Sequence, residues 1–455
     1  MGILTSDIRV LDPAEIEAIC DTSLNILENT GVRVPDVYCL ERCKAHGARV
    51  DEASGVVRIP SAVLRELINA AKRRPRPVPG PLRGVVSTQV HLVDYESTTR
   101  RLGLLDDVRK GIALIQALDY IPTCNAVVVP SDVPANMTDV VSFRYIYSYS
   151  RKPGGTYVLS PDSARRIVEM AAVVGRSVWC LLDPISPLQF RKESLEIAAI
   201  FAGAGQPVCV ASMVMAGATG PVTLAGTLAL HNAELLATQF IVYALGGGFP
   251  AKVYNSGPHS MDMRTMLCSF GSPNQAVLGI AMAQIARHLG IDAVCNSGLT
   301  DALRPDFQAG IEKGLSAALA ALAGAEEVGC QGLVGADQGF SFEQLVLDNE
   351  WLRTLDFMRR GFAVNEETLA TEQIAAAGIG GSFLAEEHTA KHMRDHHFAS
   401  KILNRQGWDA WAAAGAPDAL GRAHEAVLAA TKGWERADAV CSEEQFRELA
   451  RLAEY

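Results

Sequence analysis

Apolar residues gather in eight short runs along the middle of the chain, and a longer stretch with helical spacing lies between or after them. The apolar runs lie at residues 91–94, 124–129, 155–159, 178–182, 207–212, 251–256, 292–296 and 327–331. The helical stretches lie at residues 106–119, 138–150, 161–173, 191–204, 223–245, 272–288, 305–323 and 340–361. Eight alternating strands and helices predict an α/β fold of the (β/α)8 TIM-barrel type.

A doubly wound open sheet is the alternative to the barrel. Such sheets usually have fewer units and a glycine-rich phosphate-binding turn after the first strand. The sequence has no GxGxxG after its first apolar run and no GxxxxGK[ST]. The pattern therefore favours the barrel. We expect an N-terminal helical segment over residues 1–80, the barrel over 81–361 and a helical C-terminal extension over 362–455.

Composition and net charge argue against some classes of protein. The chain has 455 residues, a formal net charge of -10 and a sequence pI of about 5.5. This acidic balance argues against a nucleic-acid or anionic-membrane surface. The ten cysteines are scattered without a CxxC pair, and the N-terminus lacks a signal-peptide pattern. We expect a soluble cytoplasmic protein without a membrane span, and a homo-oligomer that buries its long helical extensions.

Polar residues follow the predicted strands, at the ends where parallel α/β folds place their ligands. Asn255 and His259 follow one run, Asn296 and Asp301 the next, and Gln331 the last. The set contains no compelling Ser-His-Asp arrangement, strand-end lysine or pair of catalytic carboxylates. Asn and Ser at such positions also cap helices, so a structural role stays open for several of them. A pocket lined by such uncharged, weakly reactive side chains suits an enzyme that positions a substrate for a reactive group brought by another molecule.

Histidines in the C-terminal extension form a separate pattern. His388, His392 and His396 are spaced four residues apart, which places them on one face of a predicted helix. Three histidines on consecutive turns cannot all reach one tetrahedral ion, and no HExxH pattern accompanies them. We therefore predict no metal site and interpret them as a polar helix face near the barrel mouth.

Several motifs resemble the trimethylamine methyltransferase superfamily. The stretch Ile26-Leu27-Glu28-Asn29-Thr30-Gly31-Val32-Arg33-Val34 looks like its opening. Similar segments are Pro184-Ile185-Ser186-Pro187-Leu188, Ser297-Gly298-Leu299-Thr300-Asp301, Pro305-Asp306-Phe307-Gln308-Ala309-Gly310, Phe342-Glu343-Gln344 with Asp348-Asn349-Glu350, and Gly381-Ser382-Phe383-Leu384 with His388-Thr389. Together they cover most of the chain in the expected order and spacing.

This resemblance implies a (β/α)8 enzyme that moves a methyl group from a methylated amine to the cobalt of a separate corrinoid protein. One branch of the family uses pyrrolysine, whereas this chain has only the twenty standard residues. It is therefore similar to the non-pyrrolysine branch, whose members demethylate quaternary amines such as glycine betaine. The resemblance implies a corrinoid (methylcobamide) carried by the partner protein, with no tightly bound cofactor.

From these arguments we assign candidate site residues. The candidate catalytic residues are His259, Asp301 and Glu343. The candidate substrate-binding residues are Tyr95, Asn255, Asn296, Gln331, Phe340 and Phe342. The aromatic rings, with Tyr254, would face a quaternary nitrogen. Two alternatives stay open: another barrel enzyme, such as a lyase or hydrolase acting on a small polar substrate, and a betaine-binding protein without catalytic activity.

Overall fold

The computed structural model describes residues 8–74, 80–97, 99–155, 157–250, 252–436 and 438–454, with the side chains of 252–256 outside this description. Its centre is a parallel six-stranded sheet. In spatial order the strands are β4 (Arg83–Val86), β14 (Glu327–Gln331), β13 (Asp292–Cys295), β10 (Lys252–Ser256), β8 (Val208–Val210) and β7 (Cys180–Leu182). Every neighbouring pair in this order is parallel.

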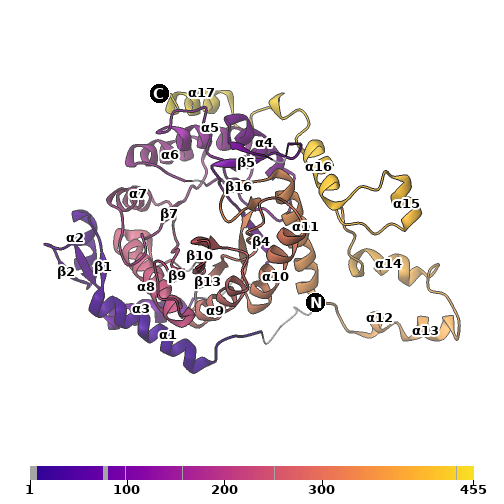
Figure 1. Cartoon of the computed structure of the whole chain (residues 1–455), viewed down its shortest axis with the longest axis horizontal. Helices are drawn as coiled ribbons and strands as arrows, with labels where there is room; N and C mark the ends of the chain where they lie inside the picture. Colours follow the sequence, from indigo (N-terminus) through magenta and orange to yellow (C-terminus); the bar gives the residue numbers. More distant parts are fainter. Residues whose placement is uncertain are drawn as a thin grey trace.

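Helices connect and cover these strands. They are α4 (Leu105–Gln116), α5 (Thr138–Tyr149), α6 (Pro161–Val174), α7 (Lys192–Gly203), α8 (Leu224–Val242), α9 (Pro273–Leu289), α10 (Phe307–Ala323) and α11 (Phe342–Arg360). Figure 1 shows α4 to α11 arranged as a ring around the strands. The eight predicted helices are confirmed, because each apolar stripe is wide enough to bury one helix face against the sheet.

Two predicted strands join the sheet only through isolated parallel bridges. Val128 bridges Gln89 beyond the end of β4, and Cys124 bridges Gly154. The predicted run at 124–129 therefore carries two isolated bridges in place of a ladder, and the bridge nearest the predicted run at 155–159 lies at Gly154, one residue before it. The protein is a mixed α/β fold whose parallel sheet is flanked by helices, and its closure into an eight-stranded barrel stays a prediction.

The predicted first barrel strand, residues 91–94, was assigned to the wrong sheet. It forms β5 (His91–Val93), which pairs with β6 (Arg100–Leu102) and with β16 (Gly339–Phe340), itself paired with β15 (Leu333–Val334). The strand in the parallel sheet is β4, immediately before it. Alternation of apolar residues marks a strand but does not identify its neighbour, which explains the error.

The N-terminal segment covers one side of the ring and is helical as expected, with an unpredicted small sheet (Figure 1). Its helices are α1 (Pro13–Asn25), the π-helical turn η1 (Ile26–Thr30), α2 (Val37–Ala45) and α3 (Ser61–Lys72). The antiparallel sheet has the order β1 (Val32–Arg33), β3 (Val56–Arg58), β2 (Arg49–Asp51). Asp12 and Glu15 form a capping box at the start of α1.

Helix α8 is the most apolar of the ring helices and continues into the π-helical turn η2 (Tyr243–Gly247). It is long and apolar enough to cross a membrane, yet 89% of that window is buried inside the protein. A helix that is apolar on all sides belongs in a protein core or a membrane. Its burial against neighbouring elements, such as the Ser23 hydroxyl of α1 bonded to the carbonyl of Ala229, identifies α8 as a core helix.

The C-terminal extension is helical. It contains α12 (Glu366–Leu369), α13 (Thr371–Ala377), α14 (Glu387–His396), α15 (Trp408–Ala413), α16 (Ala419–Ala430), the 3-10 turn η3 (Trp434–Arg436) and α17 (Glu443–Leu452). Leu449 and Leu452 of α17 and Ala423 and Val427 of α16 are buried against the ring. Helices α12 to α15 lie to one side of it (Figure 1).

Candidate active site

His259 lies at the carboxyl ends of the parallel strands. It follows β10 and begins β11 (His259–Asp262), which pairs with β9 (Met215–Ala216) and with β12 (Leu267–Ser269). The backbone N–H of His259 donates to the carbonyl of Val214 at 2.8 Å. Two connections after neighbouring strands thus form a small sheet above the strand ends, and this sheet positions the imidazole.

Two amide side chains fix the ring of His259. Its Nδ1 lies 2.9 Å from Gln275 Oε1, and its Nε2 lies 2.7 Å from Asn296 Nδ2. An amide nitrogen only donates and an amide oxygen only accepts, so Nδ1 carries the proton and Nε2 accepts. Gln275 also donates from Nε2 to the carbonyl of Asn296 at 2.6 Å. The structure therefore brings the predicted residues His259 and Asn296 together through Gln275, which lies in the first turn of α9.

Burial keeps this histidine neutral. Desolvation lowers the pKa of His259 to about 4, although its hydrogen bond to Gln275 opposes the shift. His231 of α8 is also fully buried, and desolvation, followed by the nearby His259, lowers its pKa to about 3. Neither imidazole carries a proton that it can donate as an acid near neutral pH. This corner of the site offers neutral polar groups.

Several buried polar atoms at the strand ends have no hydrogen-bond partner among the described residues. They include Asn296 Oδ1, Gln331 Oε1 and both ring nitrogens of His231. Gln331 ends β14, next to β13, and donates its Nε2 to the carbonyl of Val328 at 2.9 Å. An unsatisfied buried polar atom costs about 1–3 kcal/mol, so such groups commonly mark positions for a ligand or a bound water. The predicted residues Asn296 and Gln331 both present an amide oxygen of this kind.

Glu234 is a buried carboxylate near the ends of β7 and β8 that the sequence reasoning missed. It accepts hydrogen bonds from Ser186 Oγ at 2.7 Å, Ser212 Oγ at 2.6 Å and the backbone N–H of Leu188 at 2.8 Å. Burial raises its pKa, and the three donors oppose the shift. The signal was present in the sequence, because His231 and Glu234 are ionisable residues three positions apart in a helix whose other residues are uncharged.

Asp337 is a second buried carboxylate, in the connection between β15 and β16. Burial raises its pKa, while a hydrogen bond from Gln89 opposes the shift. Ala336 and Asp337 both have positive φ, at 48° and 71°. Non-glycine residues held in this region indicate local backbone strain, which occurs often at ligand-binding sites.

Asp301, a predicted catalytic residue, has its carboxylate occupied by structural contacts. Its Oδ1 accepts from the backbone N–H of Phe270 at 2.7 Å, and its Oδ2 from Ser269 Oγ at 3.0 Å. The ring of Phe270 packs against His259 with a centroid distance of 4.5 Å. These contacts indicate that Asp301 orients the segment that supports His259. A direct catalytic role stays a prediction.

Glu343, the third predicted catalytic residue, contacts the C-terminal extension. Its Oε1 lies 2.9 Å from His424 Nδ1 of α16, and its Oε2 accepts from Ser341 Oγ at 3.1 Å. The ring of Tyr95 stacks on His424 with a centroid distance of 3.8 Å. The structure thus joins Glu343 and Tyr95 to one histidine of α16. Their proposed catalytic and substrate-binding roles stay predictions.

Phe340 and Phe342 are buried and pack edge to face with a centroid distance of 5.5 Å. The ammonium of Lys110 lies 4.7 Å from the Phe342 ring centroid. One face of the Phe342 ring therefore already contacts a cationic side chain of the protein. Asn255 and Tyr254 lie in β10, and their side chains fall outside the described residues.

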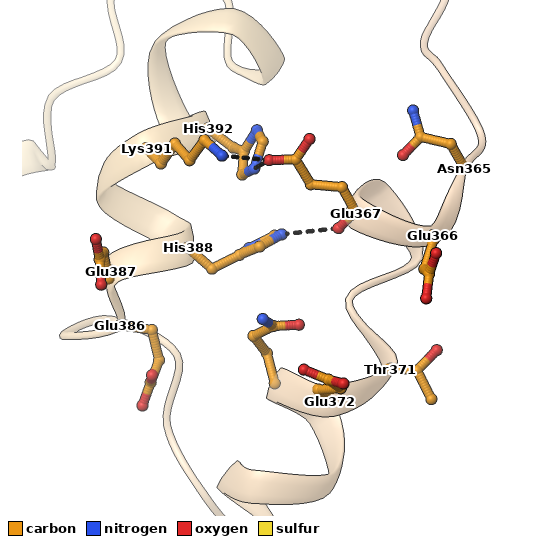
Figure 2. Close-up of a pocket in the computed structure, with 11 residues that line it drawn as sticks. Asn365, Glu366, Glu367, Thr371, Glu372, Glu386, Glu387, His388, Lys391 and His392 are labelled. Carbon is orange, nitrogen blue, oxygen red and sulfur yellow. Dashed lines mark hydrogen bonds and ion pairs between the residues drawn. The ribbon is translucent and has the colours of Figure 1, made fainter.

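The three spaced histidines lie on α14, as the helical spacing predicts, but they face α12. A cavity of about 1140 Å³ opens between α12, α13 and α14 and is lined by acidic side chains together with His388 and His392. Figure 2 shows His388, Lys391 and His392 projecting toward Glu367, which pairs with Lys391. Their surroundings therefore differ from the predicted barrel mouth. Among the residues that the structure describes, no three His, Cys, Asp or Glu side chains are placed to hold a metal ion.

Comparison with known proteins identifies the family of this chain. A family model described as "Trimethylamine methyltransferase (MTTB)" matches residues 4–439. The chain belongs to this trimethylamine methyltransferase family. The resemblance carried by the sequence motifs is thereby confirmed, and the MTTB-family match includes the strand-end cluster and most of the C-terminal extension.

Individual relatives agree with this assignment. This chain is 32% identical to trimethylamine methyltransferase MttB of Desulfitobacterium hafniense over 440 residues. That alignment covers 91% of this chain and 87% of the relative. This chain is 28% identical to the glycine betaine methyltransferase of the same species, with 90% of each chain covered. The crystal structure of monomethylamine methyltransferase from Methanosarcina barkeri is similar in fold, with a TM-score of 0.53, 11% identity and coverage of 95% of this chain and 89% of that one.

Proposed function

We propose that this protein transfers a methyl group from a quaternary amine, glycine betaine or a close relative, to the Co(I) corrinoid of a separate carrier protein. The observation that carries the proposal is the buried cluster of His231, His259, Gln275 and Asn296 at the strand ends of an MTTB-family chain. The cluster is polar, neutral at pH 7 and without a reactive nucleophile. It suits chemistry whose nucleophile is supplied by a second protein.

The reaction balances without a proton from the protein. The Co(I) electron pair forms a bond to the methyl carbon, the C–N bond breaks, and its electron pair stays on nitrogen. Cobalt becomes methyl-Co(III), and glycine betaine becomes neutral-nitrogen dimethylglycine. Trimethylamine bound as the free base would need a proton or another activator on the leaving nitrogen. His231 and His259, with pKa values lowered to about 3 and 4, do not supply one near pH 7.

The contacts suggest how the chain holds such a substrate. The unpaired oxygens Asn296 Oδ1 and Gln331 Oε1 carry partial negative charge that suits methyl groups polarised by a cationic nitrogen. The neutral imidazole of His231, with both nitrogens unpaired, can donate to a substrate carboxylate from one nitrogen. In this arrangement the protein aligns the N–CH3 bond and excludes water.

We infer that the parallel sheet closes into a (β/α)8 barrel over residues 81–361, between segments 1–80 and 362–455. The carrier protein would dock at the strand ends and bring its corrinoid as a substrate. The protein would work in the cytoplasm, where a reduced corrinoid carrier is maintained.

The test is anaerobic transfer to free cob(I)alamin, reduced with titanium(III) citrate. Glycine betaine should bleach the Co(I) absorbance and yield dimethylglycine by mass spectrometry, whereas trimethylamine should give no change. The MttB relative is named for trimethylamine, which makes that amine the second candidate substrate. Reaction with trimethylamine and not with any quaternary amine would overturn the substrate assignment but keep the methyltransferase assignment.

A further inference from the structure

The loop between β15 and β16, which we call the Asp337 loop (residues 335–338), lies at the carboxyl ends of the parallel strands. The backbone N–H of Ala336 donates to the carbonyl of Thr300 at 2.9 Å, in the segment that follows β13. On the other side of the loop, Gln89, which follows β4, donates from Nε2 to Asp337 Oδ1 at 2.5 Å. Figure 1 shows β16 inside the ring of helices. The loop is therefore held between the ends of β4 and β13, where parallel α/β proteins place their ligands.

Asp337 carries a negative charge that the protein leaves without a cation. Burial raises the pKa of its carboxyl, and the hydrogen bond from Gln89 opposes the shift. No Lys or Arg among the described residues helps to lower this pKa. Arg100 reaches the same loop, but it donates to Gln338 Oε1 at 3.2 Å. Because Asp337 also keeps solvent-accessible surface, its carboxylate is surrounded by protein and still within reach of a small ligand.

The Asp337 loop does not need this charge for its own structure. The φ of Asp337 is 71°, in the left-handed region that Asp and Asn both tolerate better than other side chains do. Asp337→Asn would also keep an Oδ1 that accepts the hydrogen bond from Gln89. The turn and this hydrogen bond therefore explain a short polar side chain at position 337, whereas the negative charge is left for a ligand to balance.

The Asp337 loop adjoins the segment that supports His259. Ala336 packs against a small apolar cluster that contains Phe270. The ring of Phe270 in turn contacts the His259 ring, with a centroid distance of 4.5 Å. Cys268 lies on β12, in the same small sheet as His259, and its pKa is raised by burial first and also by the charge of Asp337. Asp337 and His259 therefore border the same part of the strand-end site.

We propose that the carboxylate of Asp337 is the counter-charge for the cationic nitrogen of the substrate. This inference rests on the proposed function and names the residue that distinguishes a quaternary ammonium from an uncharged group of the same shape. A quaternary ammonium has no N–H to donate, so an anion attracts it through charge alone. The side chains of His259, Gln275 and Asn296 are neutral near pH 7 and do not supply that attraction. The charge of Asp337 therefore selects a cation at this site.

The reaction determines which kinetic constant this charge affects. The nitrogen loses its positive charge as the C–N bond breaks, so Asp337 attracts the bound substrate more strongly than the transition state. Asp337→Asn should therefore raise KM for the quaternary amine at least about 10-fold and leave kcat unchanged or higher. A residue that only supports the fold would lower kcat when it is replaced.

The test compares ligands that differ only in having carbon in place of the cationic nitrogen. Calorimetry on the purified full chain measures glycine betaine against tert-butylacetic acid, and choline against 3,3-dimethyl-1-butanol. The wild type should bind the cationic member of a pair at least about 10-fold more tightly, and Asp337→Asn should remove most of that preference.

Asp132→Asn is the matched control. Asp132 follows the predicted strand at residues 124–129, but it is exposed, and its Oδ1 accepts from the backbone N–H of Leu105 at 2.8 Å. This variant makes the same chemical change and should keep the preference for the cation. Thermal melts without ligand establish that both variants are folded. Asp337→Asn should melt no lower than the wild type, because it removes a charge that has no partner in the protein.

The outcomes separate this inference from the proposed function. An unchanged preference for the cation in Asp337→Asn would overturn the role of Asp337 and leave the proposed reaction standing. An equal loss of affinity for both members of a pair would also overturn it, because Asp337 would then shape the site without recognising charge. A folded wild type that binds neither glycine betaine nor choline would overturn the quaternary-amine substrate itself, and the role of Asp337 with it.

Discussion

Replacing Asp348 with alanine should destabilise the protein strongly, because Asp348 and Lys313 form an ion pair with both side chains fully buried. The ammonium of Lys313 lies 3.2 Å from Asp348 Oδ2 and donates to the carbonyl of Gly298 at 3.0 Å. Asp348 Oδ2 accepts from the backbone N–H of Gly332 at 2.7 Å. The pair thus holds α10 and α11 to the segments that follow β13 and β14, where Asn296 and Gln331 lie.

The magnitude follows from what each substitution leaves behind. Asp348→Ala leaves a buried ammonium without its anion, which costs about 3–5 kcal/mol. It also removes the acceptor for Gln344 Nε2 at 2.7 Å and Trp351 Nε1 at 2.8 Å, at about 1 kcal/mol or more for each donor left unpaired. Lys313→Met keeps those hydrogen bonds and should cost less. The double variant should be less destabilised than the sum of the two single variants, because neither charge is then left alone.

The assay is urea-induced unfolding followed by circular dichroism, with thermal melts as a second readout. Lys44→Ala is the matched control, since Lys44 pairs with Glu52 at 2.7 Å while both side chains are largely exposed. That substitution should change the free energy of unfolding by less than about 1 kcal/mol. A loss of unfolding free energy for Asp348→Ala no larger than that for Lys44→Ala would show that the buried ion pair does not stabilise the fold.

Three further predictions concern the site. His259→Ala and Gln331→Ala should each weaken substrate binding by about 1–3 kcal/mol in calorimetry, and unchanged affinity in both would remove them from the site. Burial lowers the pKa of His259 and His231 below the unfolded value of about 6.5, so their contribution to the free energy of unfolding should be fully present above about pH 6.5 and should be lost as the pH drops toward 4. His259→Gln should make thermal stability less dependent on pH in this range. His424→Ala should leave the buried Glu343 carboxylate without its partner on α16, which should lower the free energy of unfolding by about 1–3 kcal/mol and speed proteolysis near α16. Wild-type cleavage rates would contradict a role for this contact in holding α16.

The regular part of the fold could be predicted from the sequence. The run at 327–331 is β14, and each predicted helix between 106 and 361 exists, because periodic burial acts locally. The partners of strands could not be predicted in the same way. Residues 91–94 form β5 beside β6 and β16, while β4 takes the expected place in the parallel sheet. Pairing depends on contacts between distant segments, which a local pattern does not contain.

The candidate site was predictable where strand ends alone decide the position. His259 and Asn296 follow neighbouring strands and are hydrogen bonded. Gln275 and Glu234 were missed because they reach the strand ends from helices, whose inward faces are harder to identify when nearly all residues are buried. Glu343 begins α11, and only the packing of α16 decides that its carboxylate meets His424.

Methyl transfer from glycine betaine to cob(I)alamin by the purified protein is the decisive measurement for the proposed function. We expect loss of the Co(I) absorbance, one dimethylglycine formed for each methylcobalamin, and no reaction with trimethylamine. A folded protein that binds glycine betaine but forms neither product, with free cob(I)alamin or with a corrinoid carrier, would contradict the proposed function.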